Sequence, residues 1–162
     1  MDNIYLVLDG IPGESTSKQV PKSIELSSWS HGVNMALTGS QSDVGRTTGR
    51  CNHSDMVVSK RLDKTTPELN LFCSGGKTIK SATIRCFGAM DDGSTVEYYN
   101  MVLKDVLISS ISVSGGGGDR PFETVAFNYN DITWTYIQHD HDKGGKSGNV
   151  SNTWNLQTNT AA

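Results

Sequence analysis

The stretch Thr95–Gln138, TVEYYNMVLKDVLISSISVSGGGGDRPFETVAFNYNDITWTYIQ, decides the fold. Apolar and polar residues alternate along Thr95–Ser112, with the apolar set Val96, Tyr98, Val102, Val106 and Ile108 on one parity and Lys104 as the exception. The glycine run between Ser114 and Asp119 leads to a second long pattern, Glu123–Gln138, in which Ile132, Trp134 and Tyr136 share a face. Alternation with a period of two is typical of strands, so the stretch predicts two long strands joined by a flexible connection.

Four further segments carry strand patterns. Asn3–Leu8 is apolar and ends at a turn, and Thr78–Met90 is joined to the strand at Thr95 by the hairpin signal Asp91–Ser94. Ser23–Leu37 alternates loosely, so either face is a candidate for burial, and a bulge near Ser27 and Ser28 would exchange the two. With a last short strand near Trp154, we predict a mainly β domain: a compact antiparallel barrel or two-sheet sandwich of about eight strands.

One short helix is predicted from about Thr66 to Cys73. Thr65 or Thr66 supplies the N-cap, Pro67 lies in the first turn, and Gly75 and Gly76 end the helix. Leu69, Phe72 and Cys73 recur at helical spacing and form one apolar stripe. Such a stripe is expected to lie against a sheet.

Length and composition predict a single domain over residues 1–162. The chain has 35% hydrophobic and 19% charged residues and a net charge of −3, which is unlike a disordered chain and offers no concentrated positive charge for nucleic acid. Three cysteines form no paired framework, and we expect reduced thiols with Cys86 in the core. No apolar stretch approaches the ~20 residues that span a bilayer, so no membrane insertion is expected.

The N-terminus lacks the features of a secretory signal. An acidic residue stands where a signal peptide needs basic ones, and the apolar run is short. We therefore expect the chain to fold in the cytoplasm. Any export must then use a route that needs no N-terminal signal.

Residues 38–55 are expected to form a long exposed loop, with the extended part at about 39–55. The segment GSQSDVGRTTGRCNHS contains three glycines and two arginines and almost no apolar residue. Loops longer than about 12 residues are uncommon in compact domains and are usually functional or disordered.

Each segment that resembles a catalytic, metal-binding or cofactor-binding motif lacks part of that motif. His139-Asp140-His141-Asp142 holds ligand types but no further ligand cluster, and Gly75-Gly76-Lys77-Thr78 lacks the first glycine and the following helix of a phosphate-binding loop. We predict no catalytic residue, no metal and no cofactor. Two other classes remain open: a small hydrolase whose residues converge only in the fold, and a carbohydrate-binding sandwich using Trp29, Trp134, Trp154 and Tyr136, which as large strand aromatics are more typical of a core.

A set of ordered blocks resembles the haemolysin-coregulated proteins (Hcp) of type VI secretion systems. The blocks are IYLVLDGIPGES, IELSSWSHGV, DKTTPELNLFCSGGKTIKSATI, VEYYNMVLKDVLISSISVSGGGGDRP, ETVAFNYNDITWTY and the tail NTWNLQTN. They cover nearly the whole chain, and their order is more specific than any one block. The sequence departs from the family at Ser40–Asp55, which varies among its members, and at His31, where others carry an aromatic residue.

The resemblance implies a structural protein, not an enzyme. Hcp proteins form a tight β-barrel with a flanking helix that assembles into homo-hexameric rings. The rings stack into a tube wrapped by contractile sheath proteins and capped by a VgrG spike. Sheath contraction expels the tube from the bacterial cytoplasm to the extracellular space or a target cell, and many relatives carry and chaperone effector proteins in the lumen.

Two sets of site residues follow as hypotheses. The ring-stacking loop is Val44, Gly45, Arg46, Thr47, Gly49 and Arg50, whose two arginines would make charge-assisted contacts to the next ring. Ser28 and Ser30 would line the lumen, where small hydroxyls give a wetted wall; alternatively, one of them simply packs beside Trp29.

Overall fold

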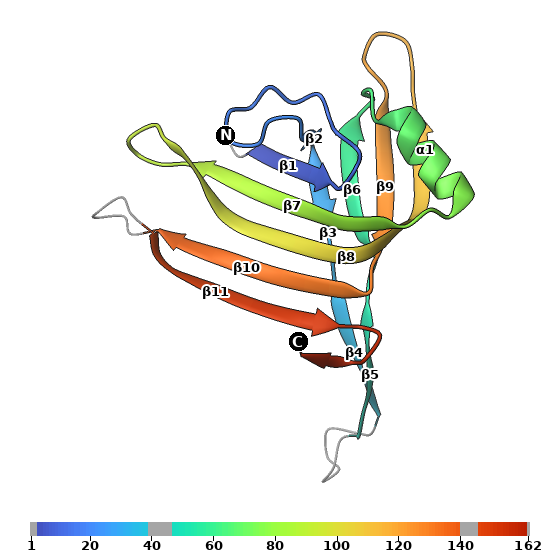
Figure 1. Ribbon diagram of the computed structural model, residues 1–162, viewed down its shortest axis with the longest axis vertical. Coiled ribbons are helices and arrows are strands. Elements are labelled where there is room, and N and C mark those ends of the chain that lie inside the picture. The colour runs from blue at the N-terminus through green and yellow to red at the C-terminus, as the bar shows by residue number, and fades with distance from the viewer. Residues whose placement is uncertain (1–2, 39–46, 140–145, 162) are drawn as a thin grey trace.

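The computed structural model describes residues 3–38, 47–139 and 146–161. In these ranges the chain forms twelve strands and one helix (Figure 1). Their bounds are β1 Asn3–Leu8, β2 Ile24–Leu26, β3 Ser28–Ser30, β4 Val33–Thr38, β5 Thr47–His53, β6 Met56–Arg61, α1 Thr66–Gly75, β7 Ile79–Ala89, β8 Thr95–Ser114, β9 Phe122–Asn128, β10 Asp131–His139, β11 Lys146–Asn155 and β12 Thr160–Ala161. The predicted mainly β, antiparallel fold with one short helix is confirmed.

Two sheets share the long strand β8. The larger sheet runs β12-β11-β10-β8-β7-β1-β2, and the smaller runs β3-β6-β9-β8. The sheets meet again where β2 continues into β3 through Ser27, whose amide donates to the carbonyl of Ser59 at 2.8 Å. The strand pairs therefore make a closed barrel, from which β10, β11 and β12 extend the larger sheet to one side (Figure 1).

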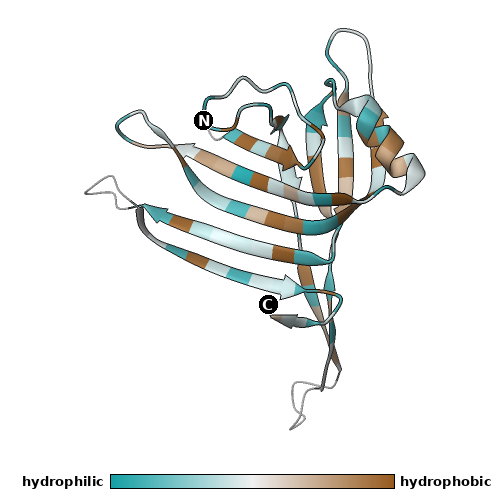
Figure 2. Ribbon diagram, in the orientation of Figure 1, coloured by the Kyte–Doolittle hydropathy of each residue, from teal (hydrophilic) through white to brown (hydrophobic). Residues whose placement is uncertain are grey.

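The barrel interior is mainly apolar. Figure 2 shows hydrophobic and hydrophilic residues alternating along the strands, as one-sided burial requires. The fully buried side chains include Leu6, Ile24, Met56, Ile84, Met101, Leu103, Phe127 and Ile132. Cys86 is also buried, as predicted, and no disulfide joins the three cysteines, all of which lie in the described ranges.

The predicted parity of β8 is wrong over its first half. The buried residues are Met101 and Leu103, and only beyond Asp105 do Val106 and Ile108 point inward. Asp105 has a φ of 52°, in the left-handed region, and both Lys104 and Asp105 are exposed. This extra outward residue shifts the inward face by one position, as a β-bulge does.

Three other boundaries differ from the prediction. Ser23–Leu37 is three strands: it breaks at Ser27, where it passes from the larger to the smaller sheet, and again before Val33, where it enters the separate two-stranded sheet of β4 and β5. Glu123–Gln138 is β9 and β10, interrupted at Tyr129 and Asn130, although both pair with β8. Within the expected loop at 39–55, Thr47–His53 forms β5 against β4; residues 39–46 lie outside the described ranges.

Helix α1 covers one end of the barrel (Figure 1). Leu69 is fully buried, and Phe72 and Cys73 pack against the core, so the predicted stripe is confirmed. The helix ends at Gly76, whose left-handed φ of 61° lets the amide of Lys77 reach the carbonyl of Phe72 at 3.0 Å. Thr65 occupies the N-cap position.

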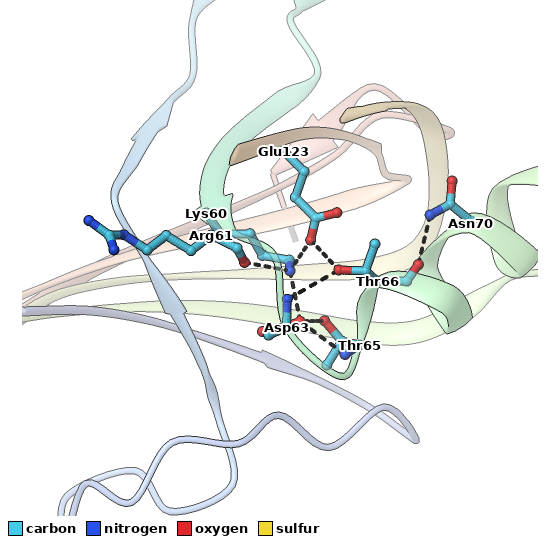
Figure 3. A network of polar contacts seen from close by, with 7 residues as sticks. All are labelled: Lys60, Arg61, Asp63, Thr65, Thr66, Asn70 and Glu123. Atoms are coloured by element: carbon cyan, nitrogen blue, oxygen red, sulfur yellow. Dashed lines mark hydrogen bonds and ion pairs between the residues drawn. The ribbon is translucent and has the colours of Figure 1, made fainter. Parts of the chain in front are cut away.

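A buried charged cluster fixes the helix to the smaller sheet (Figure 3). The Lys60 side chain is fully buried and pairs with Glu123 and, at 2.9 Å, with Asp63. The hydroxyl of Thr66 at the start of α1 donates to Glu123 Oε1 at 2.8 Å. Burying these charges is tolerable because each has an opposite charge beside it.

Candidate functional site

The outward face of the smaller sheet is rich in small hydroxyl side chains. Strand register places Ser28, Ser59, Thr124 and Ser112 in one cross-strand row. The next row is Ser30, Val57, Ala126 and Ser110. We call these two rows the hydroxyl face.

Alternation along each strand explains why these residues share a face. Their neighbours Trp29, Val58, Val125 and Ile111 point the other way, into the barrel, where Val58 and Val125 are fully buried. Ser28, Ser30, Ser110, Ser112 and Thr124 are exposed. The alternative in which Ser28 or Ser30 packs beside Trp29 is therefore excluded, because Trp29 lies on the opposite face.

No ionisable side chain lies within the two rows of the hydroxyl face. Beyond one end of the face, Arg61 is the cross-strand partner of Phe122, and its guanidinium carbon lies 5.4 Å from the centroid of the Phe122 ring. At the other end Asp55 accepts from Ser109 at 2.6 Å and from Asn128 at 3.1 Å. The two rows are thus wettable and uncharged, with Val57 and Ala126 as their apolar members, which suits weak contact with many proteins better than tight binding of one.

The smaller sheet has two unpaired borders in the described chain. β3 pairs only with β6, and the β8 segment beyond Val106 pairs only with β9. Backbone amides and carbonyls on such borders are open to pairing with another strand. One border lies at each side of the hydroxyl face.

Strands β4 and β5 form an arm that projects from the body (Figure 1). Val33, Met35 and Leu37 alternate on β4 and are 51%, 44% and 55% exposed. We call these three residues the apolar stripe. Three exposed apolar side chains in a row on a projecting hairpin are typical of a contact surface.

The residues predicted for ring stacking are distributed unevenly along this arm. Gly49 and Arg50 lie on β5 where the register with β4 shifts between Met35 and Leu37. The guanidinium of Arg50 donates to the carbonyl of Leu156, beyond β11, so Arg50 is held within its own chain. Thr47 begins β5, whereas Val44, Gly45 and Arg46 lie outside the described residues.

The sequence predicted part of the hydroxyl face and missed the rest. Ser59, Ser110, Ser112 and Thr124 complete it from three other strands, and only the alternating Ser110, Ser112 and Ser114 left a local signal. The large aromatics proposed as a sugar platform do not form one. Trp29 stacks on Tyr99 with centroids 6.1 Å apart, Trp134 stacks on His53, Trp154 packs against the core, and only Tyr136 is as much as half exposed.

Motifs for metals and membranes yield nothing in the described ranges. No group of three His, Cys, Asp or Glu side chains is close enough there to hold a metal ion. His139 Nε2 lies 2.8 Å from the carbonyl oxygen of Glu97, while Asp140, His141 and Asp142 fall outside those ranges. Among the helices of the described segments, none has the length and apolar character that a bilayer crossing requires.

Known proteins resemble this chain in sequence and in fold over nearly its whole length. Residues 5–136 match the family model described as "Type VI secretion system effector, Hcp". Protein hcp1 of Pseudomonas aeruginosa is 34% identical over 163 residues, covering 99% of this chain and 98% of that protein. A solved structure of a type six secretion system protein superposes with a TM-score of 0.91 at 28% identity over the full length of both chains.

A second solved structure, Hcp1 of Salmonella typhimurium, superposes with a TM-score of 0.77 over 99% of both chains at 22% identity, which shows the shared fold. The family model and the full-length relative together identify the sequence. The chain belongs to the Hcp family of the type VI secretion system. It is not a family of enzymes.

Proposed function

We propose that the chain is the subunit of a type VI secretion inner tube, in which six copies close into a ring with the hydroxyl face lining the lumen. The observation that carries the proposal is the smaller sheet, which has a hydroxyl face between two unpaired borders. A head-to-tail ring needs two different, complementary borders on each subunit. β3 and the end of β8 are such a pair.

Ring closure also pairs the open strand borders, which could otherwise pair with an unlimited number of further copies. Six four-stranded sheets, with strands about 4.8 Å apart and tilted by roughly 40°, would enclose a backbone ring about 48 Å across. Side chains reduce this to a passage of about 40 Å. A small folded domain fits through such a passage.

The lumen would carry effector proteins. A wall of Ser and Thr hydroxyls stays hydrated and offers no charge or large apolar patch on which cargo would stick. Ser28 and Ser30 contribute to this wall from the strand nearest one border. Weak, reversible contact agrees with a role as carrier and chaperone.

Rings would stack through the arm. Its exposed apolar stripe can dock on the next ring, and the predicted ring-stacking residues 44–50 would extend that contact. The stack would be enclosed by contractile sheath proteins and capped by a VgrG spike. Because a Pseudomonas aeruginosa relative 30% identical over 111 residues is named "Major exported protein", we infer assembly in the bacterial cytoplasm and expulsion to the extracellular space or a target cell.

Native mass spectrometry tests the ring. Six copies of the 17.5 kDa chain give a mass of about 105 kDa. Deleting residues 44–50 should leave the six-copy stoichiometry unchanged and abolish tubes in negative-stain micrographs. A monomer at high protein concentration refutes the ring, and unaltered tubes after the deletion refute the stacking role.

A further inference from the structure

The arm is anchored by a cluster of four side chains that we call the arm foot: His31, His53, Tyr129 and Trp134. His31 precedes β4 and His53 ends β5, and Val33 is the cross-strand partner of His53 at the base of the arm. Tyr129 lies between β9 and β10, and Trp134 lies on β10. The arm foot therefore joins the arm to the body of the domain.

The hydrogen bonds of the arm foot determine which ring nitrogen of neutral His31 carries the proton. The Tyr129 hydroxyl donates its only proton to the carbonyl of Ser54 at 3.1 Å. It must then accept from His31 Nε2, its other partner. A neutral His31 carries its proton on Nε2, and a second proton must be added at Nδ1.

His53 is held by ring contacts instead. Its ring stacks on Trp134 with centroids 6.2 Å apart and meets the edge of Tyr129 at 6.4 Å. Its Nδ1 is buried and has no hydrogen-bond partner among the described residues. The two histidine rings lie 6.4 Å apart, so charging both would place two positive charges side by side.

No carboxylate is paired with either imidazole in the described part of the chain. Asp55, the acidic group closest in sequence to His53, already accepts from Ser109 and Asn128. Cys51 on β5 donates weakly to the Asn52 carbonyl, and Arg50 is bound at Leu156. Tyr129 remains neutral because burial, Asp55 and Cys51 all raise its pKa.

Both histidines favour the neutral form in this setting. Burial lowers the pKa of His31, and the neighbouring His53 lowers it further. Burial also lowers the pKa of His53. Each imidazole therefore regains its ordinary pKa of about 6.5 only when the cluster opens.

We propose that the arm foot is a proton-operated joint, which holds the arm while His31 and His53 are neutral and releases it when they take up protons. The consequence rests on the proposed function: acidification would free the arm and dissolve ring stacking while leaving the barrel intact. The core of the barrel contains no histidine, so the effect is confined to the arm.

The direction follows from proton linkage. The open arm binds more protons than the closed arm at pH values below about 6.5, so the closed state is fully stable above that pH and loses stability as the pH falls. The opening constant should rise about tenfold per pH unit if one histidine is coupled and about a hundredfold if both are. This rise in the opening constant stops once the pH falls below the lowered pKa values that the two histidines have in the closed state.

Amide hydrogen exchange on the intact assembled protein measures how the opening constant of the arm depends on pH. After correction for intrinsic rates, protection of β5 should fall by at least tenfold between pH 7.5 and 5.0, while protection of β7 stays constant. NMR titration of the imidazole signals should give midpoints for His31 and His53 below 6.5, in the range where β5 loses protection. Unchanged β5 protection, or midpoints that do not coincide with its loss, overturns the proposal.

Two variants sharpen the result. His53→Phe keeps a ring against Trp134 but cannot titrate, and it should remove at least half of the pH dependence on a logarithmic scale. His139→Gln, outside the arm foot, should behave as the unaltered chain. A His53→Phe protein with the full pH dependence overturns the proposal; if the variant opens the arm at every pH, the titration of the unaltered chain decides.

Failure of the joint and failure of the tube are distinguishable. An arm that opens with acid in a protein that never forms tubes supports the joint and contradicts the proposed function. Tubes that form equally at pH 7.5 and 5.0, with an arm of constant protection, contradict the joint alone.

Discussion

Ser28 on β3 lies directly opposite Ser59 on β6, and the row continues through Thr124 to Ser112 on β8. Four hydroxyl residues on four neighbouring strands thus cross the whole smaller sheet from one unpaired border to the other. If β3 of one subunit pairs with β8 of the next, the row continues from subunit to subunit. The wall of the lumen would then be one uninterrupted sheet with hydroxyls facing inward.

Cysteine cross-linking tests the pairing of the two borders. With Cys51 and Cys73 replaced by serine, cysteines at one position of β3 and one of β8 should oxidise between subunits and give a ladder up to six chains on a non-reducing gel. Suitable pairs combine Ser28 or Ser30 with Ser110 or Ser112, because adjacent strands bring Cα atoms to about 5 Å, within disulfide range.

The single-cysteine variants are the controls for this ladder. In a head-to-tail ring, Ser30 meets β8 of its neighbour and never another Ser30, so single variants should remain uncross-linked. Dimers from a single-cysteine variant would indicate a two-fold interface and rule out the ring.

The apolar stripe should govern stacking without affecting the ring. Met35→Lys places a charge on an exposed position of the arm, where folding is affected by less than about 0.5 kcal/mol. The 105 kDa ring should persist, while light scattering should show shorter or no tubes. Leu71→Lys, on an exposed position of α1, is the matched control and should leave tube length unchanged.

The Lys60–Glu123 pair should be essential to stability as a pair. Glu123→Leu leaves a fully buried lysine with only Asp63, which should cost about 3–5 kcal/mol and lower the Tm by roughly 10 °C. Lys60→Met combined with Glu123→Leu should recover part of this loss, since no buried cation is left unpaired. A double variant less stable than both single variants would show that the charges themselves stabilise the fold.

The left-handed backbone conformation at Asp105 should tolerate some substitutions and not others. Asp105→Val puts a β-branched side chain at a φ of 52° and should destabilise the domain by about 1–2 kcal/mol, whereas Asp105→Gly should be neutral or stabilising. Thermal unfolding of the two variants measures the difference. Equal Tm values would mean that the residue leaves this conformation without cost.

Periodicity predicted the elements whose burial follows one face throughout. β1, the β7–β8 hairpin and α1 have clear alternation or helical spacing bounded by Gly, Pro and Asp, and the structure places them within a few residues of the prediction. The parity of β8 failed because a single exposed residue, Asp105, shifts the inward face. Asp is one of the few non-glycine residues enriched in the left-handed region, but its place in an alternating run does not by itself indicate that conformation. Ser23–Leu37 failed because it crosses between sheets at Ser27.

The candidate sites, too, could be predicted only in part, because they depend on contacts between residues far apart in sequence. Ser28 and Ser30 could be nominated from the chain, but Ser59, Thr124 and Ser112 join them only through strand pairing between residues far apart in sequence. β5 has few apolar residues, so its pattern resembles a loop, and only pairing with β4 makes it a strand. The arm foot brings His31 to Tyr129 across 98 positions.

The distance between lumen-facing residues of neighbouring subunits tests the central claim most directly. Spin labels attached at Ser30→Cys, with Cys51 and Cys73 replaced by serine, report it through double electron–electron resonance. In a six-membered ring lined by the hydroxyl face, neighbouring labels should lie about 20 Å apart and opposite labels about 40 Å apart. A nearest spacing above about 35 Å would place Ser30 on the outside of the ring, and the absence of any dipolar coupling would mean that no ring forms; either result contradicts the account.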